Sequence, residues 1–161
     1  MVLLKTTAGL LSMAGLALAL SVNTAAAQDQ STNRVAAKTD WSVFVEDNPT
    51  ECWSVSTPKE TVNTRDGRVV AATRSQILFM VFYRPSAEAK GQVAFTGGYP
   101  FASGSTVNVN ISGTEFELFT DGEWAWPATA ADDTKIVTAM KRGADAVVTA
   151  AVEEAESRCG G

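Results

Sequence analysis

The sequence predicts a mainly β fold, an antiparallel β-sandwich with one or two C-terminal α-helices. Short segments of alternating apolar and polar residues follow one another from Trp41 to Trp126. Three of the turns between them carry residue pairs typical of tight hairpins, Asp66-Gly67, Ser112-Gly113 and Asp121-Gly122. After Pro127 the apolar residues recur at helical spacing instead. Many short strands followed by helix favour a sandwich with its helical part at the end of the chain.

The residues before this region predict export from the cell. A positively charged start, Met1–Lys5, precedes the small and apolar run Ala8–Leu20, and Ala25–Ala27 matches the small side chains that signal peptidase accepts. We therefore predict a signal peptide at 1–27, a flexible lead-in at 28–40 and a single domain at 41–161. The alternative, an uncleaved anchor, is disfavoured because the run is too short to cross a bilayer comfortably. The expected location is the periplasm, the cell surface or the medium, with no membrane span after cleavage.

The expected strands alternate in the manner of half-buried β-structure. In chain order they are 41–45, 52–57, 60–65, 68–73, 76–84, 92–96, 106–111, 114–120 and 123–126. The strand 76–84 is apolar on both faces, which predicts a central strand covered from both sides. In 106–111 the alternation places Val107, Val109 and Ile111 toward the core.

The C-terminal part predicts helix. Asp132 and Asp133 are suited to cap a helix start, and Ile136 and Met140 give that helix an apolar stripe. Residues 150–158, rich in alanine and glutamate, are predicted to form a second helical segment.

Two interpretations of the region between these segments stay open. One long helix can run from Asp132 to Arg158, or the helix can break near Gly143 and leave 146–149 extended. The break is favoured because Val147, Val148 and Thr149 are β-prone.

Charge and composition exclude several functions. The chain has 18 acidic and 13 basic residues and a formal charge of −5, and removing the leader with Lys5 makes the remainder more acidic. Such a chain repels nucleic acid, so we expect no nucleic-acid partner. The absence of histidine excludes Ser-His-Asp and Cys-His catalysis and ordinary zinc sites. No phosphate-binding loop or dinucleotide fingerprint is present. We predict no catalytic residue, no cofactor and no metal.

Acidic residues offer two weaker alternatives. Glu115 and Glu117, with Glu123 across the turn, suggest a two-carboxylate hydrolase, although a solvated strand face explains them more simply. An oxygen-ligand site from 132–133 with 153–154 is likewise less favoured than helix capping.

Cysteines and aromatic residues give the remaining site predictions. Cys52 and Cys159 are an even pair in an exported chain, which predicts one disulfide, with two free thiols as the alternative. Trp124 and Trp126 share one side of a strand and, with Tyr99, form a possible binding surface for sugar or peptide. Core packing or edge covering is the commoner role for two tryptophans on one side of a strand, and it is the favoured interpretation of Trp124 and Trp126.

Five segments together resemble the invasion-associated locus B family, exported proteins of alphaproteobacteria. They are Asp40-Trp41-Ser42-Val43, Asn48-Pro49-x-x-Cys52-Trp53, Gly97-Gly98-Tyr99-Pro100-Phe101, Gly122-Glu123-Trp124-Ala125-Trp126-Pro127 and Ala139-Met140-Lys141-Arg142-Gly143. The resemblance spans Trp41 to Cys159 and implies a β-sandwich in the periplasm or at the cell surface. For pathogenic members it implies a part in host-cell invasion. Many members have an extra cysteine where this chain has Phe44.

These observations favour a non-enzymatic envelope or surface protein that binds an unidentified protein or envelope component. A small-ligand carrier with an apolar pocket between the sheets is the first alternative. An acidic-residue hydrolase is the second.

Overall fold

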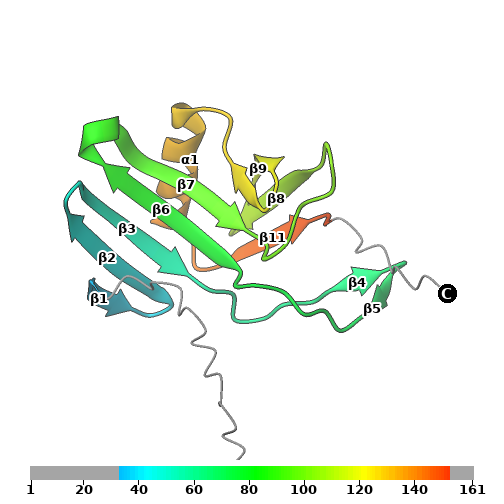
Figure 1. Ribbon diagram of the computed structural model, residues 1–161. Coiled ribbons are helices and arrows are strands. Elements are labelled where there is room, and N and C mark those ends of the chain that lie inside the picture. The colour runs from blue at the N-terminus through cyan, green and yellow to red at the C-terminus, as the bar shows by residue number, and fades with distance from the viewer. Residues whose placement is uncertain (1–32, 153–161) are drawn as a thin grey trace, which may run out of the picture. The chain divides into compact units, whose positions relative to one another are not determined.

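The computed structural model describes residues 33–152, and its fold is mainly β, as predicted (Figure 1). The predicted signal peptide lies outside these residues. The elements in chain order are β1 (Arg34–Lys38), β2 (Trp41–Asp47), β3 (Thr50–Ser56), β4 (Thr64–Arg65), β5 (Arg68–Val69), β6 (Leu78–Arg84), a 3₁₀ turn (Pro85–Ala87), β7 (Ala89–Thr96), β8 (Thr106–Ile111), β9 (Thr114–Asp121), β10 (Trp124–Trp126), α1 (Ala130–Met140) and β11 (Ala146–Ala150).

The sandwich is built from one continuous antiparallel sheet. Nine strands pair in the order β1-β2-β3-β6-β7-β10-β9-β8-β11, while β4 and β5 form a separate hairpin. The inner faces of both halves meet in a single hydrophobic core, to which α1 contributes Ile136. Antiparallel sheets allow this arrangement because one face packs on the core and the other remains open.

The core confirms the alternation expected from the sequence. Val107 and Val109 are 0% exposed and Ile111 is 3% exposed, so the inward face of β8 is the predicted one. Val81 of β6 and Val93 of β7 join them from the other half of the sheet.

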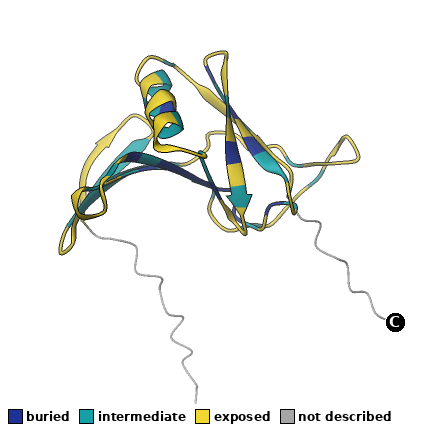
Figure 2. Ribbon diagram, turned by 90° about the horizontal axis from the view of Figure 1, so that it is seen from above, coloured by how far each residue is buried: buried dark blue, intermediate teal, exposed yellow. Residues whose placement is uncertain are grey.

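The central strand β6 is covered less than predicted. Its inner side chains pack in the core, but no helix or strand of residues 33–152 makes a second layer over its outer side chains, and Figure 2 shows α1 on one side of these strands only.

Helix α1 begins earlier than predicted, and Thr129 caps it. The Thr129 hydroxyl oxygen accepts a hydrogen bond from the backbone N–H of Asp132 at 3.2 Å. Thr129 has an extended backbone, as an N-cap residue requires, and the two aspartates fall within the first turn. The prediction that Asp132 and Asp133 cap the helix is therefore wrong, although carboxylates in the first turn still favour the helix dipole.

Asp133 joins α1 to the sheet. Its Oδ1 accepts a hydrogen bond from the backbone N–H of Val93 at 2.8 Å. Strand β10 pairs with β7 at Thr96 and Phe95 and ends at Trp126. The Val93 amide lies beyond that pairing, and the carboxylate supplies the acceptor that a longer strand would have given.

The chain between α1 and β11 decides between the two C-terminal interpretations. Residues 146–150 form β11 and pair with β8, so the break near Gly143 is confirmed and the continuous helix is wrong. A side chain at Gly143 would place its Cβ 2.7 Å from Ile111 Cγ2, which explains why the turn carries glycine. The predicted helix at 150–158 is wrong for its first residues, since Ala150 belongs to β11 and Val152 bridges Phe101. Residues 153–158 lie outside the described part of the chain.

Two segments in the N-terminal part of the domain differ from the prediction. Arg34–Lys38, predicted as flexible lead-in, pairs with β2 as an edge strand. Its five side chains are all exposed, so main-chain hydrogen bonding forms this strand without an apolar pattern that would reveal it. The strands predicted at 60–65 and 68–73 shorten to the two-residue strands β4 and β5.

Candidate functional site

The most extensive candidate surface is the face of the sheet that points away from the core, here called the outer face. Strand registers place apolar side chains from six strands of the sheet on it: Phe44, Trp53, Val55, Leu78, Met80, Phe82, Ala94, Phe119, Trp124 and Trp126. Helix α1 packs on the opposite, inner face through Ile136 (Figure 2). Most of the outer side chains are half-buried, whereas Ala94 is buried and Phe119 and Trp124 are exposed.

Trp124 and Trp126 form the end of this face that the sequence predicted. They lie on the same side of β10, and their rings stack with centroids 6.4 Å apart and an interplanar angle of 19°. Ala125 between them is 0% exposed and points into the core, whereas Trp124 is 36% exposed. Phe119 lies opposite Trp126 on β9 and is 52% exposed. Trp126 is half-buried, and neither tryptophan belongs to the hydrophobic core, so the favoured interpretation of core packing does not hold for them.

A second aromatic group continues the outer face across β2, β3 and β6. The Phe44 and Trp53 rings stack with centroids 5.6 Å apart. Phe82 is the next residue in the same cross-strand row. The Arg84 guanidinium lies over its ring, 4.5 Å from the centroid, and its Nε donates to Glu51 Oε2 at 2.7 Å. At this end of the outer face, the aromatic residues Phe44, Trp53 and Phe82 are therefore bordered by the ion pair of Arg84 and Glu51, here called the charged margin.

Tyr99, the third predicted surface residue, belongs to a different group. The guanidinium of Arg74 lies over its ring, 4.6 Å from the centroid. The same arginine donates from Nη1 to the carbonyl oxygen of Gly97 at 3.2 Å. The structure therefore brings Trp124 and Trp126 together and gives Tyr99 a separate role beside Arg74.

Most of the outer face cannot be recognised from the sequence. The signal was present in β6, where Leu78, Met80 and Phe82 alternate with the inward Phe79 and Val81. The sequence alone predicts that such an apolar strand is covered on both faces, because periodicity does not show whether a second layer exists.

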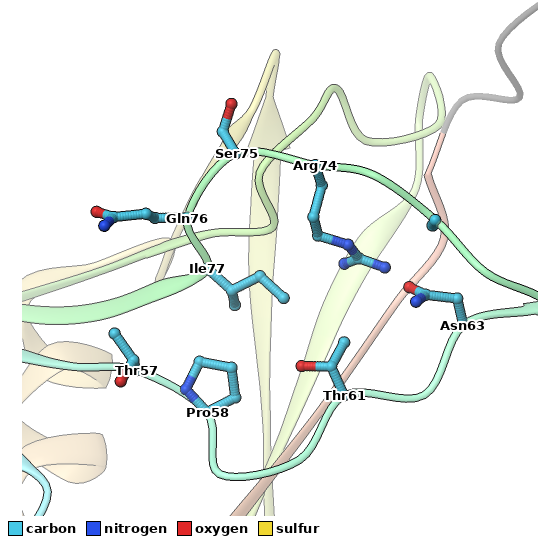
Figure 3. Close-up of a pocket in the computed structure, with 9 residues that line it drawn as sticks. Thr57, Pro58, Thr61, Asn63, Arg74, Ser75, Gln76 and Ile77 are labelled. Atoms are coloured by element: carbon cyan, nitrogen blue, oxygen red, sulfur yellow. The ribbon is translucent and has the colours of Figure 1, made fainter.

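A pocket of about 300 Å³ lies beside Arg74, between residues 57–63 and 72–77. Figure 3 shows Arg74 pointing into it, toward Thr61 and Asn63, with Pro58 and Ile77 on another side. This pocket is formed by the connection around the β4–β5 hairpin. It does not have the position, between the sheet halves, that the small-ligand carrier alternative predicted.

The acidic residues weighed for hydrolysis lie in the open. Glu115 and Glu117 point outward from β9 and are both exposed, and Glu117 Oε1 accepts from the Thr106 hydroxyl at 2.8 Å. Glu123 is also exposed, in the turn before β10. The two strand carboxylates lie side by side on one strand, whereas hydrolysis by a carboxylate pair requires groups that flank a bound substrate.

Asp132 and Asp133 have structural partners within the domain. Lys135 donates to Asp132 Oδ1 at 2.8 Å, and this hydrogen bond lowers the pKa of Asp132. Burial raises the pKa of Asp133, while the hydrogen bond from Val93 opposes that effect. Their proposed partners at 153–154 lie outside the described residues. Within residues 33–152, no cluster of histidine, cysteine or acidic residues is arranged to hold a metal ion.

Cys52 lies half-buried in β3, opposite Val45 of β2 and Tyr83 of β6. Its predicted partner, Cys159, lies outside the described residues, so the disulfide stays a prediction. No helix in the described part of the chain is long and apolar enough to cross a membrane.

No family model matches the sequence, and neither curated proteins nor solved structures give a match.

Proposed function

We propose that this protein is a non-enzymatic, exported envelope or surface protein that binds a protein or envelope component through the outer face. The observation that carries the proposal is the outer face itself, and above all the stacked pair Trp124 and Trp126 beside Phe119. Soluble proteins rarely leave a large contiguous apolar surface open unless it binds something. The signal-peptide pattern of the first 27 residues supports export.

The anatomy of the outer face supports a macromolecular partner. Tryptophan and tyrosine are enriched among the residues that dominate binding energy, because they bury a large area with little loss of conformational freedom. A charged margin such as Arg84 with Glu51 is typical of the rim of a protein interface.

The resemblance to the invasion-associated locus B family supports the same proposal and extends it. On that resemblance, a pathogenic source would use the protein in host-cell invasion. The binding experiment below does not depend on that extension.

The test is saturable binding of the purified protein to fractionated envelope extracts of its own source. We expect Trp124→Ala and Phe119→Ala to weaken that binding at least about tenfold, the usual effect of truncating a central aromatic contact. Tyr83→Ala is the matched control, because Tyr83 is an aromatic residue of similar exposure, 39%, on the inner face.

Two results would count against the proposal. One is the absence of saturable binding to any envelope fraction. The other is equal weakening by the Tyr83 control, which would mean that the outer face is not the contact surface.

A further inference from the structure

Arg74 is held in place by groups that do not neutralise it. Its Nη1 donates to the carbonyl oxygen of Gly97 at 3.2 Å, and its guanidinium lies 4.6 Å from the centroid of the Tyr99 ring. A carbonyl oxygen and a ring face fix the orientation of a guanidinium but carry no net negative charge. The side chain is therefore positioned with its charge uncompensated by these contacts.

No carboxylate among residues 33–152 forms an ion pair with Arg74, although acidic residues outnumber basic ones by 18 to 13 in the chain. Arg84, by comparison, pairs with Glu51 at 2.7 Å. Taking a charge partly out of water costs free energy that an opposite charge normally offsets. A half-buried arginine without such a partner is suited to receive a negative charge from a ligand.

The pocket beside Arg74 provides room for that ligand. Figure 3 shows the guanidinium pointing into the space toward Thr61 and Asn63, which contribute a hydroxyl and an amide. Pro58 and Ile77 supply apolar surface on another side of the same pocket. No acidic residue lines it, so nothing in its wall repels an anion.

We propose that this pocket binds a small organic carboxylate, with Arg74 as the residue that pairs with its negative charge. The planar guanidinium matches the geometry of a carboxylate, and the Thr61 hydroxyl and Asn63 amide can donate further hydrogen bonds to its oxygens. Pro58 and Ile77 would contact a short aliphatic part of the ligand. The volume of about 300 Å³ lies at the lower end of the range for ligand pockets and leaves ample room for an acid of a few carbon atoms.

Two sources can supply this chemistry, a free small acid or the C-terminal carboxylate of a peptide chain. The inference does not depend on the outer face, because none of its ten apolar residues lines the pocket.

The experiment is a titration of the ¹⁵N-labelled protein, followed by NMR. The probes are butyrate, its uncharged amide butyramide, a short peptide with a free C-terminus and the same peptide with an amidated C-terminus. We expect butyrate to shift the amide signals of Thr61, Asn63 and Gln76 saturably in the millimolar range, and butyramide to leave them unchanged. Binding of the free peptide but not of the amidated one would extend the site to chain termini. Binding of butyrate alone would restrict it to free acids.

Three variants separate ligand binding from a structural role of Arg74. Arg74→Gln should weaken butyrate binding at least about tenfold, since it removes the charge-assisted contact. Thr61→Val should weaken it about threefold without changing the thermal midpoint, because Thr61 is exposed and the valine keeps its shape. Arg68→Gln, at an exposed position of the neighbouring hairpin, should leave the affinity within about twofold because surface charges are screened by salt.

The proposal is overturned if butyrate gives no saturable shifts at these residues, or if butyramide binds as well as butyrate. It is also overturned if Thr61→Val, folded as judged by its thermal midpoint, binds butyrate unchanged while Arg68→Gln weakens binding as much as Arg74→Gln. That last pattern would indicate diffuse attraction to positive charge.

Discussion

Asp133 provides the sharpest test of how α1 is attached to the sheet. Replacing it with alanine removes the acceptor for the Val93 amide, 2.8 Å away, and Val93 is 0% exposed. A buried N–H left without a partner costs about 1–3 kcal/mol. The helix dipole attracts the Asp133 carboxylate by about 0.3–1 kcal/mol, but burial and the neighbouring Asp132 disfavour its charge, so the lost hydrogen bond dominates the effect. We expect Asp133→Ala to lower the free energy of unfolding by about 2–3 kcal/mol.

Asp133→Asn is the matched control, because its side-chain oxygen can still accept from Val93. We expect it to unfold within about 1 kcal/mol of the unmodified protein, because it keeps the acceptor, and the attraction to the helix dipole that it loses is opposed by the burial and the neighbouring Asp132 that disfavour the Asp133 charge. Thermal unfolding followed by circular dichroism gives the comparison. For a domain of this size the alanine variant should melt about 10 °C lower. An alanine variant that melts together with the asparagine variant would refute the role assigned to the hydrogen bond.

The pH dependence of the same pair has a defined sign. Burial raises the pKa of Asp133, so the folded protein binds a proton at pH values where the unfolded chain has released it. The contribution of Asp133 to the free energy of unfolding is fully present below the pKa of the unfolded chain. It is lost as the pH rises through the pKa of the folded protein. The melting temperature of the asparagine variant relative to the unmodified protein should therefore be highest at neutral pH and fall as the solution is acidified. A relative melting temperature that rises on acidification would contradict this assignment.

Three further predictions concern the helix cap, one tight turn and the cysteines. Thr129→Ala should lower the free energy of unfolding by about 1 kcal/mol because α1 loses its N-cap, whereas Thr129→Ser should not; urea unfolding measures both. Gly98→Ala should lower the free energy of unfolding by about 2 kcal/mol or more, since φ is +81° and the new Cβ would clash with the Ser75 carbonyl oxygen; a melting midpoint equal to that of the unmodified protein would contradict it. Cys52 and Cys159 should appear in one disulfide-linked peptide in mass spectrometry of the non-reduced protein isolated from its source, and two freely alkylated thiols would show that no disulfide forms.

Short-range patterns in the sequence were sufficient for most of the fold. The alternation in 106–111 identified the buried face of β8, because a strand with one face in the core has a period of two. The pair Ser112-Gly113 connects β8 to β9, and both residues have positive φ, as its tight turn requires. The β-branched run 147–149 likewise indicated the extended segment that became β11.

Other elements had no such local signal. Strand β1 forms because its main chain pairs with β2. Its five side chains are all exposed, so this pairing produces no alternation of apolar and polar residues in the sequence. The N-cap of α1 is a second example. Threonine and aspartate are both favoured at this position, so the sequence does not show whether Thr129 or one of the two aspartates caps the helix.

For the candidate sites, the sequence by itself determined that Trp124 and Trp126 share one side of a strand. Only the tertiary structure decided that this side is open. Burial depends on whether another layer packs against a face, and α1 packs on the inner face, away from the tryptophans. The placement of Arg74 beside Tyr99 and the pocket was likewise decided in three dimensions, because it joins the segment before β6 to the loop after β7. Contacts between segments distant in sequence follow from packing of the whole chain, and local periodicity does not encode them.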